Sequence, residues 1–298
     1  LHTVSALHGY LKVNGTTGFI SQYWGSQGSL PYEDDAWCDN NERCHRVDQG
    51  DYAGDFWIGE TSRDQYTGWF FGMEMAYDAL ADEDVRTQIR EDILEVLTTL
   101  IDDQWRIIDE EGEPSTKAPF IIPAYRLAWL LTGYHVTGDE EIAEELQSWL
   151  LDEKRPLLKL SSISTMNRYA QYYGNNLNHT NWFNVLRLGR VYLSPEDFAF
   201  LVEVFENQVH TFTRLSHNAW FNGIFMSQGA YEPGAKNDQH QDQLEQDLTD
   251  FPEAPNYRYF RPAPDPSTYT LDPVSVFLHD LQVQFPFLEE LMGGVEPQ

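Results

Sequence analysis

A run of polar and aromatic residues at 172–182 holds the densest set of groups suited to chemistry in this sequence. Two tyrosines, one histidine, one tryptophan and several uncharged hydrogen-bonding residues occupy the run. Histidine ordinarily titrates with a pKa near 6.5, which suits proton transfer at neutral pH. We therefore identify His179 as a candidate proton-transfer residue, Tyr173 as a candidate acid, and Asn176 and Asn178 as candidate substrate ligands.

Within this run, Asn178-His179-Thr180-x-Trp182 resembles the Asn-His-Ser/Thr-x-Trp/Tyr signature of toroid alginate lyases and related uronate lyases. The resemblance implies a polysaccharide lyase in which Asn178 neutralises a uronate carboxylate and His179 removes the C5 proton. A tyrosine donates to the leaving oxygen in that family, which is the role that Tyr173 would take. The alternative is structural: His179 then caps a helix or lies at the edge of the core.

A second polar cluster, at 59–66, stands directly before a strongly apolar segment. In the functional interpretation Arg63 binds or orients an anionic group, Asp64 positions Arg63, and Tyr66 contacts substrate. Glu60 and Asp64 are also candidates for the two carboxyl groups of a glycosidase, one of which is kept protonated by its surroundings. The structural alternative is an ordinary helix N-terminus, where an acidic residue suits the helix dipole.

An acidic turn follows the pattern Asp48-x-Gly50-Asp51-x-x-Gly54-Asp55. Its carboxylates and glycines suit a loop that wraps Ca²⁺, although the spacing is not that of an EF-hand. A solvated acidic turn is the alternative, and the sequence predicts no other metal or cofactor.

The two cysteines, Cys38 and Cys44, lie in one loop and are the only ones in the chain. Their isolation and close spacing predict a disulfide, worth roughly 2.4 kcal/mol on the chain-entropy estimate, rather than two free thiols. A disulfide favours an oxidising compartment, extracellular or periplasmic. His45 is adjacent, but no second pair of ligands at zinc spacing accompanies it.

Helical periodicity recurs along the chain and predicts antiparallel hairpins at 61–106, 120–152 and 178–210. In each hairpin an aromatic-rich helix precedes an acidic amphipathic one, and cap signals mark their ends. Residues 1–13 and 217–229 predict two further helices. Strand signals are poor, with a short β-hairpin in 8–24 as the one candidate. Irregular loops are predicted at 25–60, 107–118, 153–175 and 231–270.

An internal repeat supports this layout, since HTNWFN at 179–184 recurs as HNAWFN at 217–222. Repeating hairpins of this size predict an all-α fold, a complete or incomplete (α/α) toroid, in a single domain spanning 1–298. The aromatic helices would lie inside. Four tryptophans are then candidates to line a central funnel and stack on sugar rings: Trp69, Trp129, Trp182 and Trp220.

The composition narrows the classes of partner. With 48 acidic residues against 19 basic ones, the net charge of −29 argues against nucleic acid and anionic membranes. No apolar run approaches the ~20 residues that span a membrane, so no membrane insertion is expected. Two triplets, beginning at Asn14 and Asn178, match the N-glycosylation pattern.

Together these features predict a carbohydrate-active enzyme that cleaves an extracellular polysaccharide or oligosaccharide. β-Elimination by a lyase is slightly favoured over hydrolysis. The alternative is a non-catalytic helical-repeat protein that binds glycan or protein, or that forms a surface assembly. In a toroid all inner helices run the same way, so we expect residues 60–66 and 172–182 to share one rim and one site.

Overall fold

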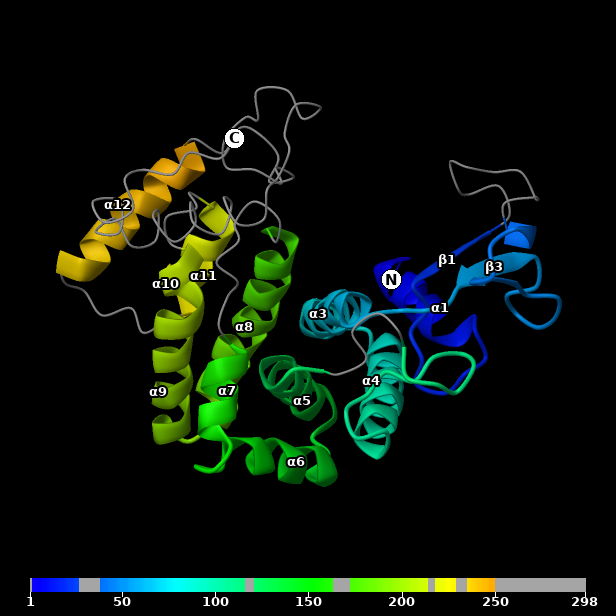
Figure 1. The fold of residues 1–298 in the computed structure, drawn as a ribbon, viewed down its shortest axis with the longest axis horizontal. Helices are drawn as coiled ribbons and strands as arrows, with labels where there is room; N and C mark the ends of the chain where they lie inside the picture. Colours follow the sequence, from blue (N-terminus) through cyan, green and yellow to red (C-terminus); the bar gives the residue numbers. More distant parts are fainter. Residues whose placement is uncertain are drawn as a thin grey trace, which may run out of the picture. The chain divides into compact units, whose positions relative to one another are not determined.

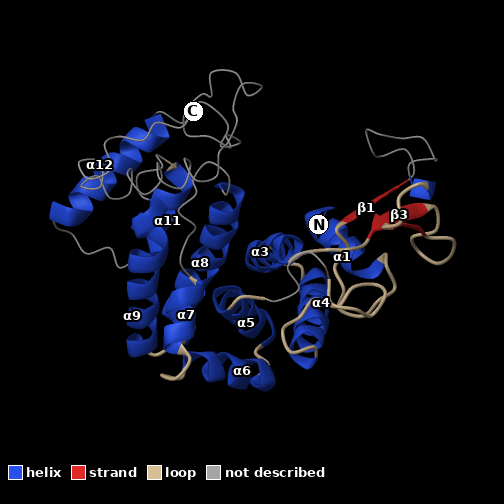
Figure 2. Cartoon of the chain, in the orientation of Figure 1, coloured by secondary structure: helices blue, strands red, loops and turns tan. Residues whose placement is uncertain are grey.

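The structure is a computed structural model that describes residues 2–26, 38–115, 121–162, 172–213, 218–228 and 235–249, with the side chains of 172, 173, 212, 228 and 235–240 left undescribed. The chain is mainly helical, with one small sheet, as predicted for an all-α class (Figures 1 and 2). It folds into two compact units. Unit 1 covers Leu1–Lys154 and unit 2 covers Arg155–Gln298.

Unit 1 contains two predicted helical hairpins. α3 with α4 forms the first and α5 with α6 the second, and α4 packs against both α3 and α5. A further helix, α1, packs on α3 and α4 where a helix was predicted at 1–13. The bounds of the helices are α1 His2–Lys12, α3 Arg63–Ala79, α4 Glu83–Asp102, α5 Pro123–Thr137 and α6 Glu140–Leu150.

The helix ends follow from local signals in the sequence. Ser62 caps α3 with its side chain, and Asp82 caps α4 by accepting the N–H groups of the first turn. Gly138 ends α5 in the left-handed conformation, at φ 67°, which glycine adopts without a steric penalty. These caps satisfy backbone groups that a helix leaves without partners, so they fix where each hairpin turns.

A three-stranded antiparallel sheet is the main departure from the prediction for unit 1. β1 (Tyr23–Ser26) and β2 (Cys44–Arg46) both pair with β3 (Asp55–Ile58). The β-hairpin expected in 8–24 is wrong, because α1 runs through it to Lys12 and β1 pairs with the distant β3. The expected loop at 25–60 holds β2, β3 and the second half of β1. Strands of three or four residues carry too little periodicity to be seen without their distant partners.

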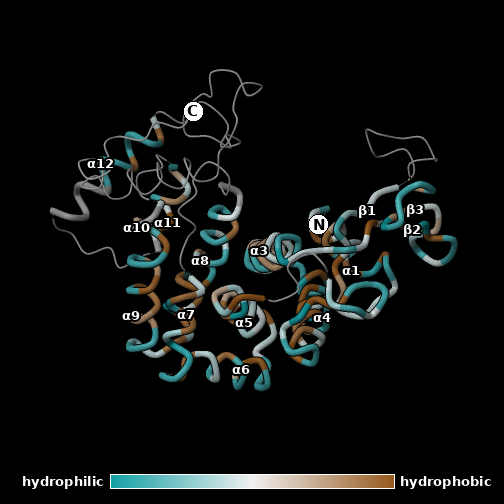
Figure 3. Tube along the Cα trace, viewed as in Figure 1, coloured by the Kyte–Doolittle hydropathy of each residue, from teal (hydrophilic) through white to brown (hydrophobic). Residues whose placement is uncertain are grey.

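Aromatic side chains fill the core of unit 1. Trp129 of α5 stacks on two rings of α3, with centroid distances of 5.8 Å to Tyr66 and 5.0 Å to Phe70. Ile93 and Leu97 of α4 are fully buried. Figure 3 shows apolar and hydrophilic residues interspersed along α4, as expected of a helix that covers a core on one side.

Unit 2 is helical throughout its described residues. It confirms the helical prediction for 178–210 and the helix expected at 217–229. Its helices are α7 Arg155–Ser161, α8 Tyr172–Tyr192, α9 Pro195–Val204, η1 Phe205–His210, α10 Thr211–Thr213, α11 Ala219–Gln228 and α12 Ala235–Thr249.

Two expected loops of unit 2 contain helices instead. α7 lies within 153–175, whose last four residues begin α8, and α12 lies within 231–270; residues 163–171, 231–234 and 250–270 fall outside the described residues. α8 begins at Tyr172 rather than near 178. The run at 172–182 is therefore the first half of α8 rather than a loop leading into a helix.

A π-helical turn interrupts the long helix that Ser194 caps. α9, η1 and α10 follow one another without a break, and η1 is the π-helical segment. His210, at the end of η1, is buried and bonds through Nε2 to Asn222 Oδ1 of α11 at 2.9 Å. The contact joins η1 to α11 inside unit 2.

Candidate functional site

Residues 59–62 join β3 to α3 in unit 1 and follow an unusual backbone path. Glu60 has φ 55°, in the left-handed region, which costs a non-glycine residue about 1–3 kcal/mol. The flanking residues hold this path in place. Ser62 caps α3, and the carbonyl of Thr61 accepts a hydrogen bond from Ser115 Oγ at 2.7 Å. Strain maintained in this way is found more often at functional sites than elsewhere.

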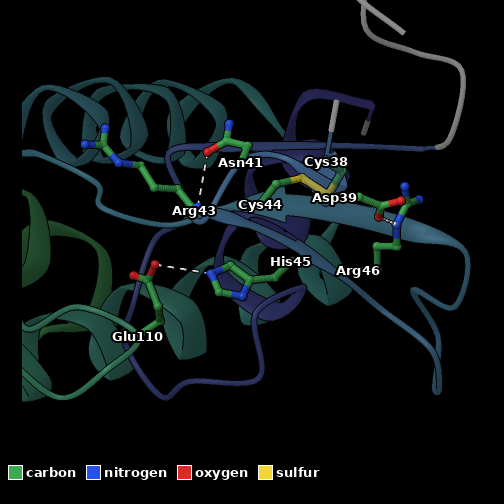
Figure 4. The surroundings of a disulfide bond; sticks show 8 residues. All are labelled: Cys38, Asp39, Asn41, Arg43, Cys44, His45, Arg46 and Glu110. Carbon is green, nitrogen blue, oxygen red and sulfur yellow. Dashed lines mark hydrogen bonds and ion pairs between the residues drawn. A yellow bond between two sulfur atoms is a disulfide. The ribbon is translucent and has the colours of Figure 1, made fainter. Parts of the chain in front are cut away.

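Glu110, from the loop after α4, closes over this junction. Its Oε2 accepts the backbone N–H of Glu60 at 3.1 Å. Its Oε1 accepts Nε2–H of His45 at 3.3 Å, as Figure 4 shows. The carboxylate lies so close to Gly59 that a Cβ there would stand 1.5 Å from Oε1. Only glycine at position 59 therefore leaves room for Glu110 to bridge Glu60 and His45.

The side chain of Glu60 forms an ion pair with Arg43, which precedes β2. The side chains of Glu60 and Glu110 are only 17% and 13% exposed. Two half-buried carboxyl groups from distant parts of the chain thus meet at one short segment. Each has a nitrogen partner, Arg43 or His45. Glycoside hydrolysis uses a pair of carboxyl groups that flank the scissile bond, so carboxyl groups gathered at one segment are candidates for that chemistry.

A third carboxyl group, Asp64, stands at the start of α3. Burial raises the pKa of Asp64, and the neighbouring Arg63 guanidinium partly opposes this shift. Arg63 lies over the ring of Tyr125, with 5.7 Å from its Cζ to the ring centroid, so it makes a cation–π contact. Burial also raises the pKa of Tyr125, which therefore keeps its proton at neutral pH.

The contact between Arg63 and Tyr125 shows where two of the predicted inner helices, α3 and α5, begin relative to each other. Arg63 is the first residue of α3 and Tyr125 lies in the first turn of α5. Since these residues touch, α3 and α5 begin at the same end of unit 1, as predicted for them. Arg63, Asp64 and Glu60 thus belong to one end of the unit.

Residues 60–66 and 172–182 belong to different units. Their meeting in one site remains a prediction.

His45 connects this junction to a pocket. It lies opposite Trp57 in the β2–β3 ladder and stacks on it, with centroids 4.2 Å apart and planes 22° apart. His45 and Trp57 help to line an open pocket of about 740 Å³ in unit 1. His45 is therefore held by Glu110 on one nitrogen and by an indole on one face.

Several of these residues escaped the sequence prediction. Glu110 lies in the acidic turn DEEGEP, where nothing distinguishes it from its neighbours, and Arg43 and Tyr125 carry no motif. His45 was considered only as a zinc ligand. Their common feature is long-range contact, since Glu110 is 50 residues from Glu60 and 65 from His45.

His179, the predicted base, lies in the core of unit 2. It is fully buried, Nδ1–H donates to the carbonyl of Asn175 at 2.8 Å, and Nε2 lies 3.1 Å from Thr213 Oγ1. Its ring stacks on Phe221 with centroids 4.0 Å apart. The expected pKa near 6.5 is wrong, because burial lowers the pKa of His179 to about 4. The structural alternative describes this neutral, bonded ring better than a catalytic role does.

The neighbours of His179 differ in exposure. Asn178 is buried and donates to the carbonyl of Ser162 at 3.3 Å, whereas Asn176 is exposed. The side chain of Tyr173 and residue His217 of the repeat lie outside the described residues.

The aromatic candidates prove to be mostly core. Trp69, Trp129 and Trp182 point inward as predicted but are at most 2% exposed, and Tyr66 is also 2% exposed. Side chains so completely covered have no face for a sugar ring, so their expected role in lining a funnel is corrected to packing. Trp220 is the exception, at 37% exposed, although it matches Trp182 in the repeat.

The expected Ca²⁺ turn is not a gathered set of ligands in this structure. Asp48 and Asp51 are exposed, and Asp55 Oδ2 accepts Nε1–H of Trp24 at 2.9 Å. Among the described residues, only Glu74, Asp78 and His135 bring three donor atoms within 4.8 Å of one another. This cluster joins α3 to α5, and His135 Nε2 lies 2.7 Å from Asp78 Oδ1.

The disulfide prediction is confirmed, since Cys38 and Cys44 are bonded to each other (Figure 4). Cys44 is the first residue of β2, next to His45, so the bond anchors the strand that carries the imidazole.

In both glycosylation triplets the asparagine side chain makes hydrogen bonds within the protein. The Asn14 amide donates to Phe19 O at 2.9 Å and to Ser21 Oγ at 3.0 Å, and Asn178 is buried. A glycan on either one would break these contacts.

Comparisons with family models, with curated proteins and with solved structures found no match for this chain. No helix in the described part of the chain is long and apolar enough to cross a membrane. Function therefore has to be argued from the site itself.

Proposed function

We propose that this protein is an extracellular carbohydrate-active enzyme whose acid–base chemistry takes place at the β3–α3 junction of unit 1. The observation that carries the proposal is the bridge made by Glu110 between the strained Glu60 and His45. This bridge brings the carboxyl group of Glu110 to the segment that carries Glu60, where the surrounding contacts hold Glu60 in an unfavourable backbone conformation. The disulfide supports the extracellular location.

Of the two expected reactions, hydrolysis fits this geometry better than β-elimination. Elimination was assigned to His179, which is buried with both ring nitrogens bonded. Hydrolysis needs one carboxyl group that keeps its proton and a second that is ionised. Asp64 suits the first role because burial raises its pKa, and Glu60 suits the second because it is paired with Arg43.

In this mechanism the Asp64 carboxyl group donates its proton to the glycosidic oxygen as the bond to the anomeric carbon breaks. Glu60 then either activates the attacking water or attacks the anomeric carbon itself. Arg63 is the anion-binding or orienting residue beside Asp64, and Glu110 accepts the backbone N–H of Glu60. We also propose that the hairpins belong to an incomplete (α/α) toroid whose loops surround this site.

A non-catalytic glycan-binding role is the second candidate. The observation that favours it is that Glu60 and Glu110 already have close nitrogen partners, Arg43 and His45, as structural carboxylates do.

A polysaccharide panel separates these functions. Reducing ends without ultraviolet absorbance indicate hydrolysis, absorbing products indicate elimination, and binding without products supports the second candidate. The key variant is Asp64→Asn, with Asp84→Asn as its matched control, because Asp84 occupies the same second position in α4 and is exposed. Turnover should fall about 100-fold in the first variant and be unchanged in the second. Equal activity of both variants would refute the role of Asp64.

A further inference from the structure

The pocket of about 740 Å³ in unit 1 has chemically mixed walls. One wall is nitrogenous, with His8 and Lys12 of α1 and His45 and Arg46 of β2. The other belongs to the turn after β2, with Asp51 and Tyr52. Trp57 backs His45 from β3. Trp57 is only 7% exposed and His45 stacks on it, so the aromatic surface that the pocket offers a ligand comes from Tyr52. Saccharide sites commonly combine hydrogen-bonding groups with an aromatic surface.

The charges of the walls decide what kind of ligand fits. Each nitrogenous group already has a carboxylate: His8 pairs with Asp92 at 2.8 Å, Arg46 with Asp39 at 3.2 Å, His45 with Glu110 at 3.3 Å, and Lys12 with Glu95. Asp48 and Asp51 add two more carboxylates to the lining. Even with both imidazoles protonated, the carboxylates outnumber the positive groups, and the net charge of −29 adds to this field.

We infer that this pocket is a subsite for an uncharged, hydroxyl-rich sugar ring, and that it excludes uronates and other anionic saccharides. A ligand carboxylate would meet surplus negative charge and would have to displace an existing carboxylate partner. Hydroxyl groups need neither, because paired ammonium, guanidinium and carboxylate groups still donate and accept hydrogen bonds.

Hydrogen bonds connect one wall residue of the pocket, His45, to the proposed catalytic junction. His45 lines the pocket and donates to Glu110, and Glu110 accepts the backbone N–H of Glu60. A ring that contacts His45 is therefore two hydrogen bonds away from Glu60. The inference that the pocket is a subsite rests on the proposed function, and it gives the substrate class of that function as a neutral glycan. Binding of a neutral sugar is measured separately from turnover.

The test measures Kd by titration calorimetry on the Asp64→Asn protein, so that binding is read without cleavage. The probes are maltohexaose, cellohexaose, mannohexaose and xylohexaose, against hexamers of galacturonate and mannuronate. At least one neutral hexaose should bind, and neither uronate should. Tyr52→Ala should weaken that binding about tenfold, since it removes aromatic contact area. Tyr192→Ala is the matched control, because Tyr192 is 37% exposed and lies in unit 2.

A second variant guards against misfolding, because Tyr52 also packs edge-on against Trp24 with centroids 5.5 Å apart. Asp51 is exposed, so Asp51→Lys keeps the fold while reversing one wall charge. It should leave the neutral Kd within about threefold and make uronate binding measurable. Three results would each overturn the inference. The first is tighter binding of uronates than of neutral hexaoses by the parent protein, and the second is no binding of any hexamer. The third is that Tyr52→Ala leaves the neutral Kd unchanged while Asp51→Lys leaves uronate binding undetectable. Neutral binding without turnover by the native protein would instead refute only the proposed function.

Discussion

Glu110 accepts the backbone N–H of Glu60 at 3.1 Å, although fifty positions separate the two residues in the chain. The contact places a carboxylate directly over Gly59 and holds Glu60 at φ 55°. Because that conformation is unfavourable in the absence of such contacts, the loop carrying Glu110 and the β3–α3 junction depend on each other.

Gly59→Ala tests this dependence. A Cβ at position 59 would stand 1.5 Å from Glu110 Oε1, so Glu110 must leave the junction. Glu110 can swing away, so the cost is the loss of its hydrogen bonds to Glu60 and His45: we expect turnover to fall at least about tenfold and the free energy of unfolding to drop by about 1–3 kcal/mol. Gly68→Ala is the matched control, because nothing lies within 4 Å of a Cβ there and the site is in α3. That change should stabilise the protein by about 0.5–1 kcal/mol, as read by urea unfolding. Equal effects at both positions would contradict the packing argument.

Asp64→Asn should change the pH dependence of stability as well as activity. Burial raises the pKa of Asp64 above its ordinary 3.8, so the folded state keeps this proton to higher pH than the unfolded chain. Ionising Asp64 therefore removes stability as pH rises through that interval. Relative to the parent protein, Asp64→Asn should be more stable at pH 7 than at pH 3, whereas Asp84→Asn should show no such trend. A parallel offset at both pH values would argue against a buried carboxyl group.

His179→Asn tests the buried imidazole of unit 2. Burial lowers the pKa of His179 to about 4 from an ordinary 6.5, so the unfolded chain binds this proton first as pH falls. The stability contributed by the neutral ring is complete above pH 6.5 and is lost as pH falls toward 4. The parent protein should lose about 2–3 kcal/mol between pH 7.5 and 4.5 that the variant does not lose. Urea unfolding at these two pH values gives the difference directly, and identical pH profiles would show that the imidazole titrates normally.

The disulfide should stabilise both the fold and the position of His45. Replacing Cys38 and Cys44 by serine frees the start of β2, next to the imidazole that Glu110 holds. We expect a loss of about 2 kcal/mol in the free energy of unfolding, and weaker turnover of any substrate found in the panel. Thiol-specific mass labelling verifies the native bond. Unchanged stability and activity in the double variant would show that β2 is held by the sheet alone.

The sequence alone determined the features that depend on neighbours a few positions away. Ser62, Asp82, Gly138 and Ser194 mark helix ends because caps satisfy backbone groups within one turn. Periodic apolar residues set the hairpins of unit 1, and the spacing of Cys38 and Cys44 set the disulfide.

Only the tertiary structure decided which polar groups are usable. His179 looks like a proton-transfer residue in the sequence, yet Phe221 and Thr213, both more than thirty positions away, cover and bond its ring. Glu110 looks like a solvated turn residue, yet it becomes the centre of the junction because Gly59 leaves it space. Burial, pKa and hydrogen-bond partners depend on long-range packing. Local sequence patterns therefore identify residue types that suit chemistry, but they do not show which of these residues lie together in the fold.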